Sequence, residues 1–127
     1  MSDLARVESE LRDSFCLVRL HGEVDISNVQ EISVAIECAP AHAIGGVIVD
    51  LTHTTYLDSA GIGLLVRLAE RLRGRRQQFG LLVPAESPVR AVLELTGLPS
   101  VMPLHVSLED ALEQSQNGPV RSPPENG

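Results

Sequence analysis

Ser59 is the residue around which this sequence gathers the most chemistry. In the stretch VIVDLTHTTYLDSAGIGLLVRLAERL it follows Asp58 and precedes Gly61 and Gly63. An apolar run enters this segment and a helical pattern leaves it. A serine hydroxyl in such a place could be a nucleophile, a helix cap, or the acceptor of a phosphate. The residues around it allow these three readings to be weighed.

The nucleophile reading requires a catalytic arrangement that the sequence only partly offers. The strained elbow of a serine hydrolase has the pattern Gly-x-Ser-x-Gly, because small residues permit the turn. Gly61 fits this pattern, but Leu57 stands where the first glycine belongs. A general base would also be needed, and no histidine comes with a supporting motif. The four histidines are His21, His42, His53 and His105. A small serine hydrolase using Ser59 stays open as an alternative.

The capping reading follows from the start of the helical pattern. The hydroxyl of Ser59 could accept one free backbone N–H, which is worth about 1 kcal/mol. The phosphate reading builds on the same position. Phosphoserine adds about −1.5 to −2 charges, which the free N–H groups and the dipole of a helix start tolerate. Asp58 and Asp25 would raise the negative potential further, so phosphorylation would repel a complementary partner and leave the fold intact.

The elements that must position Ser59 can be read from the periodicity. Alternation over 7–11 and an apolar run over 15–20, joined by Asp13-Ser14, predict an N-terminal hairpin, and Gly22 breaks the pattern after it. Residues 46–51 predict a strand covered on both faces, and 79–83 a second buried strand. A short extended piece is expected at 102–105.

Helices are expected between these strands. Asp25 or Ser27 would cap one that ends at Pro40, with apolar positions that include Ala39. The next begins at Ser59, with Ile62, Leu65, Ala69 and Leu72 on one face. A third begins at Ser87-Pro88 and ends at Gly97. A fourth is capped by Ser107, with Asp110 completing a loose capping box.

Strands that alternate with helices indicate an α/β fold. We expect one domain over 1–116, with a small, mostly parallel sheet, an N-terminal hairpin and about four packed helices. Residues 117–127, rich in Gly, Pro and Asn, predict a disordered tail. Binding sites of such sheets gather where the strands end. The loops at 22–25 and 52–59 follow strands at that edge and should be neighbours.

Composition limits the classes of partner. The chain has a formal net charge of −7 and 2% aromatic residues, which argue against binding of nucleic acid or an anionic membrane. The acidic start shows no secretion signal, and no apolar run approaches the ~20 residues of a membrane helix, so we expect a cytoplasmic protein. Cys16 and Cys38 lack metal-ligand spacing. They are expected to be buried reduced thiols, with a redox disulfide as the alternative. No metal or cofactor is expected.

A family resemblance rests on three segments. LHGEVD is followed one helix and one strand later by VDLTHTTYLDSAGIGLL, and then by FGLLVPAESPVRAVLELTGL. Together they resemble the bacterial anti-sigma factor antagonists, the phosphorylatable branch of the STAS domain family, over roughly residues 4–116. The Asp-Ser-Ala-Gly motif in this setting is far more specific than the tetrapeptide alone.

The resemblance implies a function and a set of site residues. The serine of Asp-Ser-x-Gly, here Ser59, would be phosphorylated by an anti-sigma factor that is itself a serine kinase. The unphosphorylated protein would bind that factor and free a sigma factor for transcription, and a serine phosphatase would restore it. The partner-binding residues would be Glu23, Asp25, Asp58, Ser59 and Gly61. Such a protein is not an enzyme.

Alternatives accompany this reading. Within the same family, the chain could be a STAS module of a transporter or of a stress-signalling complex that no such kinase controls. Thr54 and Thr55 could be secondary phosphorylation sites or structural loop residues. An arginine-rich stretch after Ser59 could contact a partner or be a solvated helix face. Its members are Arg67, Arg71, Arg73, Arg75 and Arg76.

Overall fold

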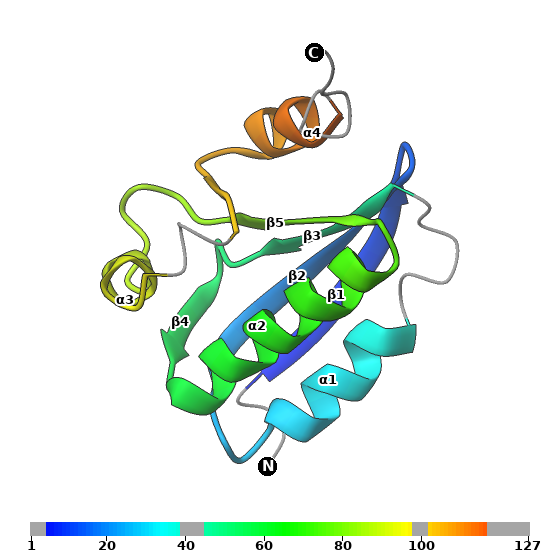
Figure 1. The fold of residues 1–127 in the computed structure, drawn as a ribbon. Helices are drawn as coiled ribbons and strands as arrows, with labels where there is room; N and C mark the ends of the chain where they lie inside the picture. The colour runs from blue at the N-terminus through cyan, green and yellow to red at the C-terminus, as the bar shows by residue number, and fades with distance from the viewer. Residues whose placement is uncertain (1–4, 39–44, 98–101, 117–127) are drawn as a thin grey trace.

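The computed structural model describes residues 5–38, 45–97 and 102–116 (Figure 1). The predicted helix end at Ala39-Pro40, His42 and the predicted tail at 117–127 lie outside these ranges, as does the side chain of Cys38. The strands are β1 (Ala5–Arg12), β2 (Phe15–Val24), β3 (Gly46–Asp50), β4 (Thr54–Leu57), β5 (Gln78–Leu82) and β6 (Leu104–His105). The helices are α1 (Val29–Cys38), α2 (Ser59–Gly74), α3 (Arg90–Leu95) and α4 (Leu108–Gln116).

The strands form one mixed sheet in the order β1-β2-β3-β5-β6, and β4 pairs with the second half of β2. Only β1 and β2 are antiparallel among the described strands, and their two-residue connection places Asp13 in the left-handed region at a φ of 58°. Aspartate tolerates that conformation better than most residues. The predicted α/β fold, with its N-terminal hairpin and four helices, is confirmed.

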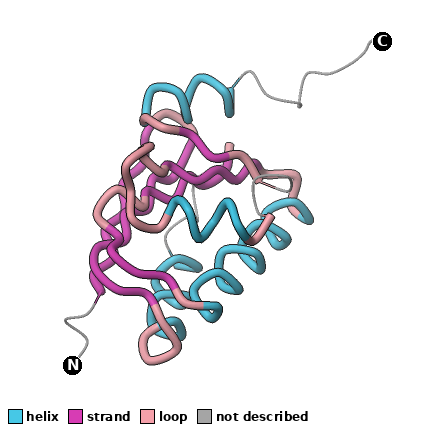
Figure 2. Tube along the Cα trace, turned by 90° about the vertical axis from the view of Figure 1, so that its left-hand side faces the viewer, coloured by secondary structure: helices cyan, strands magenta, loops and turns pink. Residues whose placement is uncertain are grey.

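Helices cover the two faces of the sheet unequally. In Figure 1, α1 and α2 lie side by side across one face, and α4 lies on the far side of β5. Figure 2, turned by 90°, shows most of the helices on one side of the strands. The larger core cluster lies between the sheet and α1 and α2, and a smaller one lies under α4. The N-terminus of α2 is therefore positioned by the larger of the two core clusters.

Strand β2 shows how the sequence divides these two cores. Cys16, Val18 and Leu20 belong to the larger cluster, whereas Phe15 and Leu17 belong to the smaller one under α4. This is the alternation that a pleated strand imposes. Cys16 is buried and free, and burial raises the pKa of its thiol.

Helix α2 buries a broad apolar stripe against the sheet. Its buried residues are Gly61, Leu64, Leu65, Leu68, Ala69 and Leu72. The predicted face is thus confirmed and widened by two leucines, and Ile62 packs at its margin. Burial of each such leucine contributes about 1.5–3 kcal/mol relative to exposure. The apolar stripe of α2 fixes how its N-terminus meets the end of β2.

The face of β1 and β2 opposite α1 and α2 carries charged side chains. Glu10 lies 2.8 Å from the guanidinium of Arg12 and 3.4 Å from that of Arg19, and hydrogen bonds from both lower its pKa. Glu8 lies 3.1 Å from Nε2 of His21, and this hydrogen bond is the largest cause of its lowered pKa. His21 also stacks on His53, with ring centroids 5.1 Å apart.

Three expectations about strands and helix starts were wrong. The loop predicted at 52–59 contains strand β4, and β2 continues past Gly22 to Val24 through a register shift at a glycine with a φ of 93°. Helix α3 begins at Arg90 and not at Pro88, because the segment from Ser87 forms a turn first. The predicted Ser107 cap is confirmed, since its Oγ accepts the N–H of Asp110 at 3.1 Å. The carboxylate of Asp110, however, lies beside His105.

Candidate functional site

Asp58 caps the N-terminus of α2. Its backbone is extended, with a φ of −100° and a ψ of −172°, and its Oδ1 accepts the N–H of Gly61 at 3.0 Å. The first helical hydrogen bond runs from the N–H of Ile62 to the carbonyl of Asp58 at 3.0 Å. Ser59 is therefore the first residue of the helix and not its cap, which corrects the capping expectation. An aspartate at the cap position leaves the serine hydroxyl free for another use.

The second carboxylate oxygen of Asp58 joins α2 to the loop after β2. Oδ2 accepts the N–H of Ile26 at 3.1 Å, and the N–H of Asp58 donates to the carbonyl of Val24 at 3.3 Å. Strands β2 and β4 end side by side, with Val24 paired to Leu57. The predicted proximity of the two loops is confirmed, and the side chain that links them is Asp58.

Asp25 organises its own loop. Its Oδ1 accepts the backbone N–H of Ser27 at 2.9 Å and the hydroxyl of Ser27 at 2.5 Å. Its carbonyl accepts the N–H of Val29, the first residue of α1, at 2.9 Å. The carboxylate thus shapes the turn before α1 and does not cap the helix directly. Nor does it hydrogen-bond Ser59, among the contacts of the residues described.

Asn28 is a support of the site that the sequence reasoning missed. The residue is buried; its Oδ1 accepts the N–H of Asp25 at 3.0 Å and its Nδ2 donates to the carbonyl of Glu23 at 2.8 Å. The oxygen and the nitrogen of the Asn28 side-chain amide thus both hydrogen-bond to the backbone of this loop. The signal in the sequence was an asparagine three residues after an aspartate, where side chains of both types bond to the local backbone.

Gly61 allows α2 to approach the strand ends closely. A Cβ at this position would lie 2.9 Å from Cδ2 of Leu57 and 3.1 Å from both Cγ1 and the carbonyl oxygen of Val24. The residue is buried, so its contribution to the site is to permit this packing. Gly63, two residues on, has only Nη1 of Arg67 within 4 Å of such a Cβ, at 3.4 Å.

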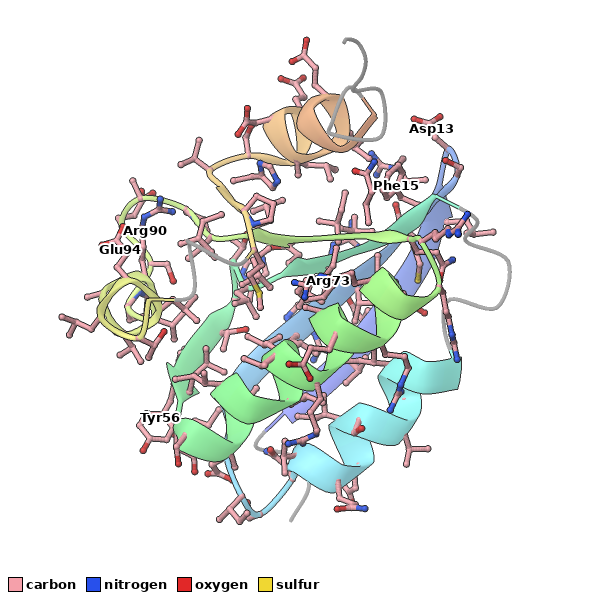
Figure 3. The ribbon with its side chains drawn as sticks, viewed as in Figure 1. Asp13, Phe15, Tyr56, Arg73, Arg90 and Glu94 are labelled. Atoms are coloured by element: carbon pink, nitrogen blue, oxygen red, sulfur yellow. The ribbon has the colours of Figure 1, made fainter. Side chains whose placement is uncertain are left out.

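The exposed groups around Ser59 combine apolar and acidic character. Ser59 is exposed, Ile26 is 76% exposed and Tyr56 is 50% exposed. Glu23 is exposed on β2 directly opposite Tyr56 on β4. Figure 3 shows Tyr56 beside the first turn of α2. The sequence analysis missed both apolar residues, although an isoleucine between Asp25 and Ser27 in a polar loop was a usable signal.

The other candidate hydroxyls and bases occupy different surroundings. Thr54 is buried, and its hydroxyl donates to the carbonyl of Leu20 at 2.7 Å, whereas Thr55 is exposed. His105 is buried beside Asp110. In the described segments no histidine makes a hydrogen bond to Ser59, so the hydrolase reading gains no general base from this geometry.

Among the described residues, no three or more His, Cys, Asp and Glu side chains are grouped so as to hold a metal ion. No helix in the same ranges has the length and apolar character needed to cross a membrane.

Known proteins of one family resemble this chain over most of its length. The family model of the STAS domain matches residues 6–111. An anti-sigma-B factor antagonist of Staphylococcus aureus, strain NCTC 8325, is 25% identical over 103 residues, which cover 81% of this chain and 94% of the relative.

Solved structures show the same relationship. The structure of an anti-sigma factor antagonist from Mycobacterium paratuberculosis superposes with a TM-score of 0.81 at 28% identity, covering 91% of this chain and 97% of that one. SpoIIAA, a Bacillus cell fate determinant, matches in its unphosphorylated form with a TM-score of 0.71 at 25% identity, covering 89% and 98%. Its phosphorylated form matches with a TM-score of 0.63 at 25% identity, covering 86% and 98%.

Proposed function

The chain belongs to the STAS domain family, and we propose that it is an anti-sigma factor antagonist controlled by phosphorylation of Ser59. In its unphosphorylated form it binds an anti-sigma factor that is a serine kinase, and a sigma factor is released for transcription. Phosphorylation ends this binding, and a serine phosphatase restores it. The chain itself performs no catalysis, needs no cofactor, and works in the cytoplasm without binding nucleic acid or membrane.

The observation that carries this proposal is the division of roles at the start of α2. The carboxylate of Asp58 supplies the cap and the link to Ile26, so the exposed hydroxyl of Ser59 takes no part in these two contacts. In the reaction, Oγ of Ser59 attacks the γ-phosphorus of ATP, the bond to ADP breaks, and the hydroxyl proton passes to a base of the kinase. The new anion lies at a helix N-terminus, where the dipole and free N–H groups favour negative charge.

The surface around Ser59 indicates what kind of partner fits. Ile26 and Tyr56 offer exposed apolar area, and the carboxylates of Glu23, Asp25 and Asp58 surround it. A complementary partner presents an apolar recess for Ile26 and Tyr56, with basic side chains opposite Glu23 and Asp25 and no cation opposite the hydroxyl of Ser59. Gly61 contributes by allowing close packing, so it acts on this surface through the backbone.

The relatives support the proposal in two ways. Both the Staphylococcus aureus protein and the Mycobacterium paratuberculosis structure are anti-sigma factor antagonists. SpoIIAA exists in a phosphorylated and an unphosphorylated form on the same fold. A phosphate-bearing state is therefore compatible with this architecture.

Phosphopeptide mapping tests the site directly. Kinases of the anti-sigma type from the source cell, incubated with the chain, ATP and Mg²⁺, should place phosphate on Ser59 and leave Ser59→Ala unmodified. Thr54 should stay unmodified because its hydroxyl is buried and hydrogen-bonded, which makes Thr55 the informative exposed control. Phosphate found on Thr55 or Ser27 with Ser59 untouched would refute the assignment.

Identification of the bound partner separates the remaining alternatives. Unphosphorylated chain should retain an anti-sigma factor from lysate, and the retained protein should be released on addition of ATP and Mg²⁺. Retention of a transporter or of a stress-complex subunit would instead indicate a STAS module outside this control. Hydrolysis of a generic ester that Ser59→Ala abolishes would indicate the hydrolase.

A further inference from the structure

We propose that phosphorylated Ser59 is held by Arg67 of the same chain, whose guanidinium reaches the phosphate across Gly63. The inference rests on the proposed phosphorylation of Ser59 and adds an intramolecular receptor for the phosphate. It assigns a role to one arginine of the basic stretch on α2 that the partner surface around Ser59 does not use.

The spacing on α2 sets up this contact. Ser59, Gly63 and Arg67 follow one another at intervals of four residues, so each pair lies on adjacent turns. Side chains on a helix lean toward its N-terminus, and the Arg67 side chain does so. Its Nη1 lies 3.4 Å from the point that a Cβ of Gly63 would occupy. That point is about 5–6 Å from Cβ of Ser59. A phosphate on Ser59 extends toward Gly63 and so shortens the distance to the guanidinium of Arg67.

Gly63 leaves the path open. Among the described residues, no atom other than Nη1 of Arg67 lies within 4 Å of the Cβ that Gly63 lacks, outside its own helix backbone and chain neighbours. The glycine is therefore not needed for packing against the sheet, in contrast to Gly61. Inside a helix, glycine is less favourable than alanine, so a glycine at position 63 needs an explanation other than helix stability. We infer that it leaves room for the long side chain of Arg67 to pass over the helix surface.

Arg67 is also available. It is exposed, and its guanidinium makes no ion pair with a described carboxylate. Each described arginine outside the basic stretch does make one: Arg6 with Glu8, Arg12 and Arg19 with Glu10, and Arg90 with Glu94. Arg67 therefore has no described carboxylate to neutralise it, and it lies about two turns of α2 from Ser59.

The chemistry favours a phosphate over the serine it replaces. A neutral hydroxyl offers the guanidinium a single weak acceptor, whereas a phosphate offers three charged oxygens that an arginine can bind with two N–H groups. The carboxylate of Asp58 is already occupied by Gly61 and Ile26 and holds its position. The contact with Arg67 would hold the phosphate against α2 and stabilise the phosphorylated form of the chain.

Titration of the phosphate by ³¹P NMR tests the contact. Phosphoserine is installed at position 59 during translation, by suppression of a stop codon, so no kinase is involved. Arg67→Gln should raise the second pKa of the phosphate by about half a unit relative to the parent chain, because a nearby cation is lost. Gly63→Gln, which fills the path, should raise it in the same direction. Circular dichroism checks that both variants keep the fold.

Arg73→Gln is the matched control. It removes the same charge from the same helix, from an exposed arginine at its far end (Figure 3). Fourteen residues along α2 place Arg73 about 21 Å from Ser59. This exceeds the Debye length of about 10 Å at 0.1 M salt, so the second pKa should change by no more than about 0.1 unit.

Equal values for the parent, Arg67→Gln and Arg73→Gln would overturn the inference. Because the phosphoserine is built in, that result would say nothing against phosphorylation by a kinase. Conversely, a kinase that modifies another residue would refute the proposed function and leave the measured Arg67 contact standing.

Discussion

At the scale of single residues, neighbouring side chains divide the work at the start of α2. Asp58 uses one carboxylate oxygen for the helix cap and the other for the loop after β2. Ser59 is exposed beside it, with a hydroxyl outside these contacts. Because the fold depends on the aspartate and not on the serine, chemistry at Ser59 can change what the surface binds without unfolding the domain.

Substitutions at Ser59 test this division. Ser59→Ala should change the free energy of unfolding by less than about 0.5 kcal/mol, because the cap belongs to Asp58. It should bind the anti-sigma factor and stay bound in the presence of ATP. Ser59→Asp should also stay folded, since the helix dipole favours its charge. Burying that charge unpaired at the interface costs several kcal/mol, so affinity should fall by about 100-fold or more.

Titration calorimetry with purified anti-sigma factor gives the affinities, and urea unfolding gives the stabilities. An aspartate carries less charge than phosphoserine and is shorter, which makes the phosphorylated chain the stronger comparison. Equal affinities of folded Ser59→Asp and Ser59→Ala would show that charge at this position is not the switch.

At the scale of elements, the sequence predicts most of the helices and strands but not the short strand β4. The hairpin, the central strand and the long helix at Ser59 follow from local periodicity, and each is present. Local periodicity does not predict strand β4, because four residues are too few to show a clear alternation. What makes it a strand is its pairing with the end of β2, which is distant in the sequence.

The same limit applied to the site. The proximity of the two loops could be predicted, because parallel strands end at one edge. The sequence could not predict whether Asp58 or Ser59 caps α2, because both residue types are good caps. The packing of Gly61 fixes where the helix begins, and this packing is a tertiary contact. The exposure of Ile26 and Tyr56 likewise depends on tertiary contacts of the residues beside them.

Glycine-to-alanine substitutions at positions 61 and 63 of α2 distinguish the effect of close packing on stability from the effect of helix propensity. Gly61→Ala places a methyl group within 2.9–3.1 Å of Leu57 and Val24, so it should lower the free energy of unfolding by about 1–3 kcal/mol. Gly63→Ala meets only the flexible end of Arg67 and should raise that free energy by up to about 1 kcal/mol. Urea unfolding measures both. Similar effects of the two changes would contradict the packing role given to Gly61.

At the scale of the whole molecule, the two faces of the sheet differ in what covers them and in the roles that we assign to them. One face is covered by α1 and α2, and the start of α2 carries the proposed switch. On the other face, beyond α4, β1 and β2 present a network of charges that includes Glu8 and Glu10. This network includes none of the proposed switch residues, so its contribution should be to the stability of the hairpin.

That contribution has a defined dependence on pH. Hydrogen bonds lower the pKa of Glu8 and of Glu10 below the ordinary value of 4.5, the first through His21 and the second through Arg12 and Arg19. A carboxyl group whose pKa is lower in the folded state than in the unfolded state stabilises the fold above the unfolded value. The stabilisation is lost as the pH falls through the folded value, because the unfolded chain then binds more protons.

Replacing both glutamates with glutamine should therefore destabilise the protein at about pH 6 and have a smaller effect at about pH 3, where the wild-type carboxyl groups are also protonated. The side chain of Glu8 is exposed and that of Glu10 is half-buried and open to solvent, so the loss should be modest and should shrink further as salt is added. The control is Glu70→Gln, which removes a charge from the exposed side of α2 where no ion pair with a described residue is formed. Urea unfolding at the two pH values measures each variant. A loss in the double variant that is the same at both pH values would show that the hairpin depends on the packing of these side chains and not on their ionisation.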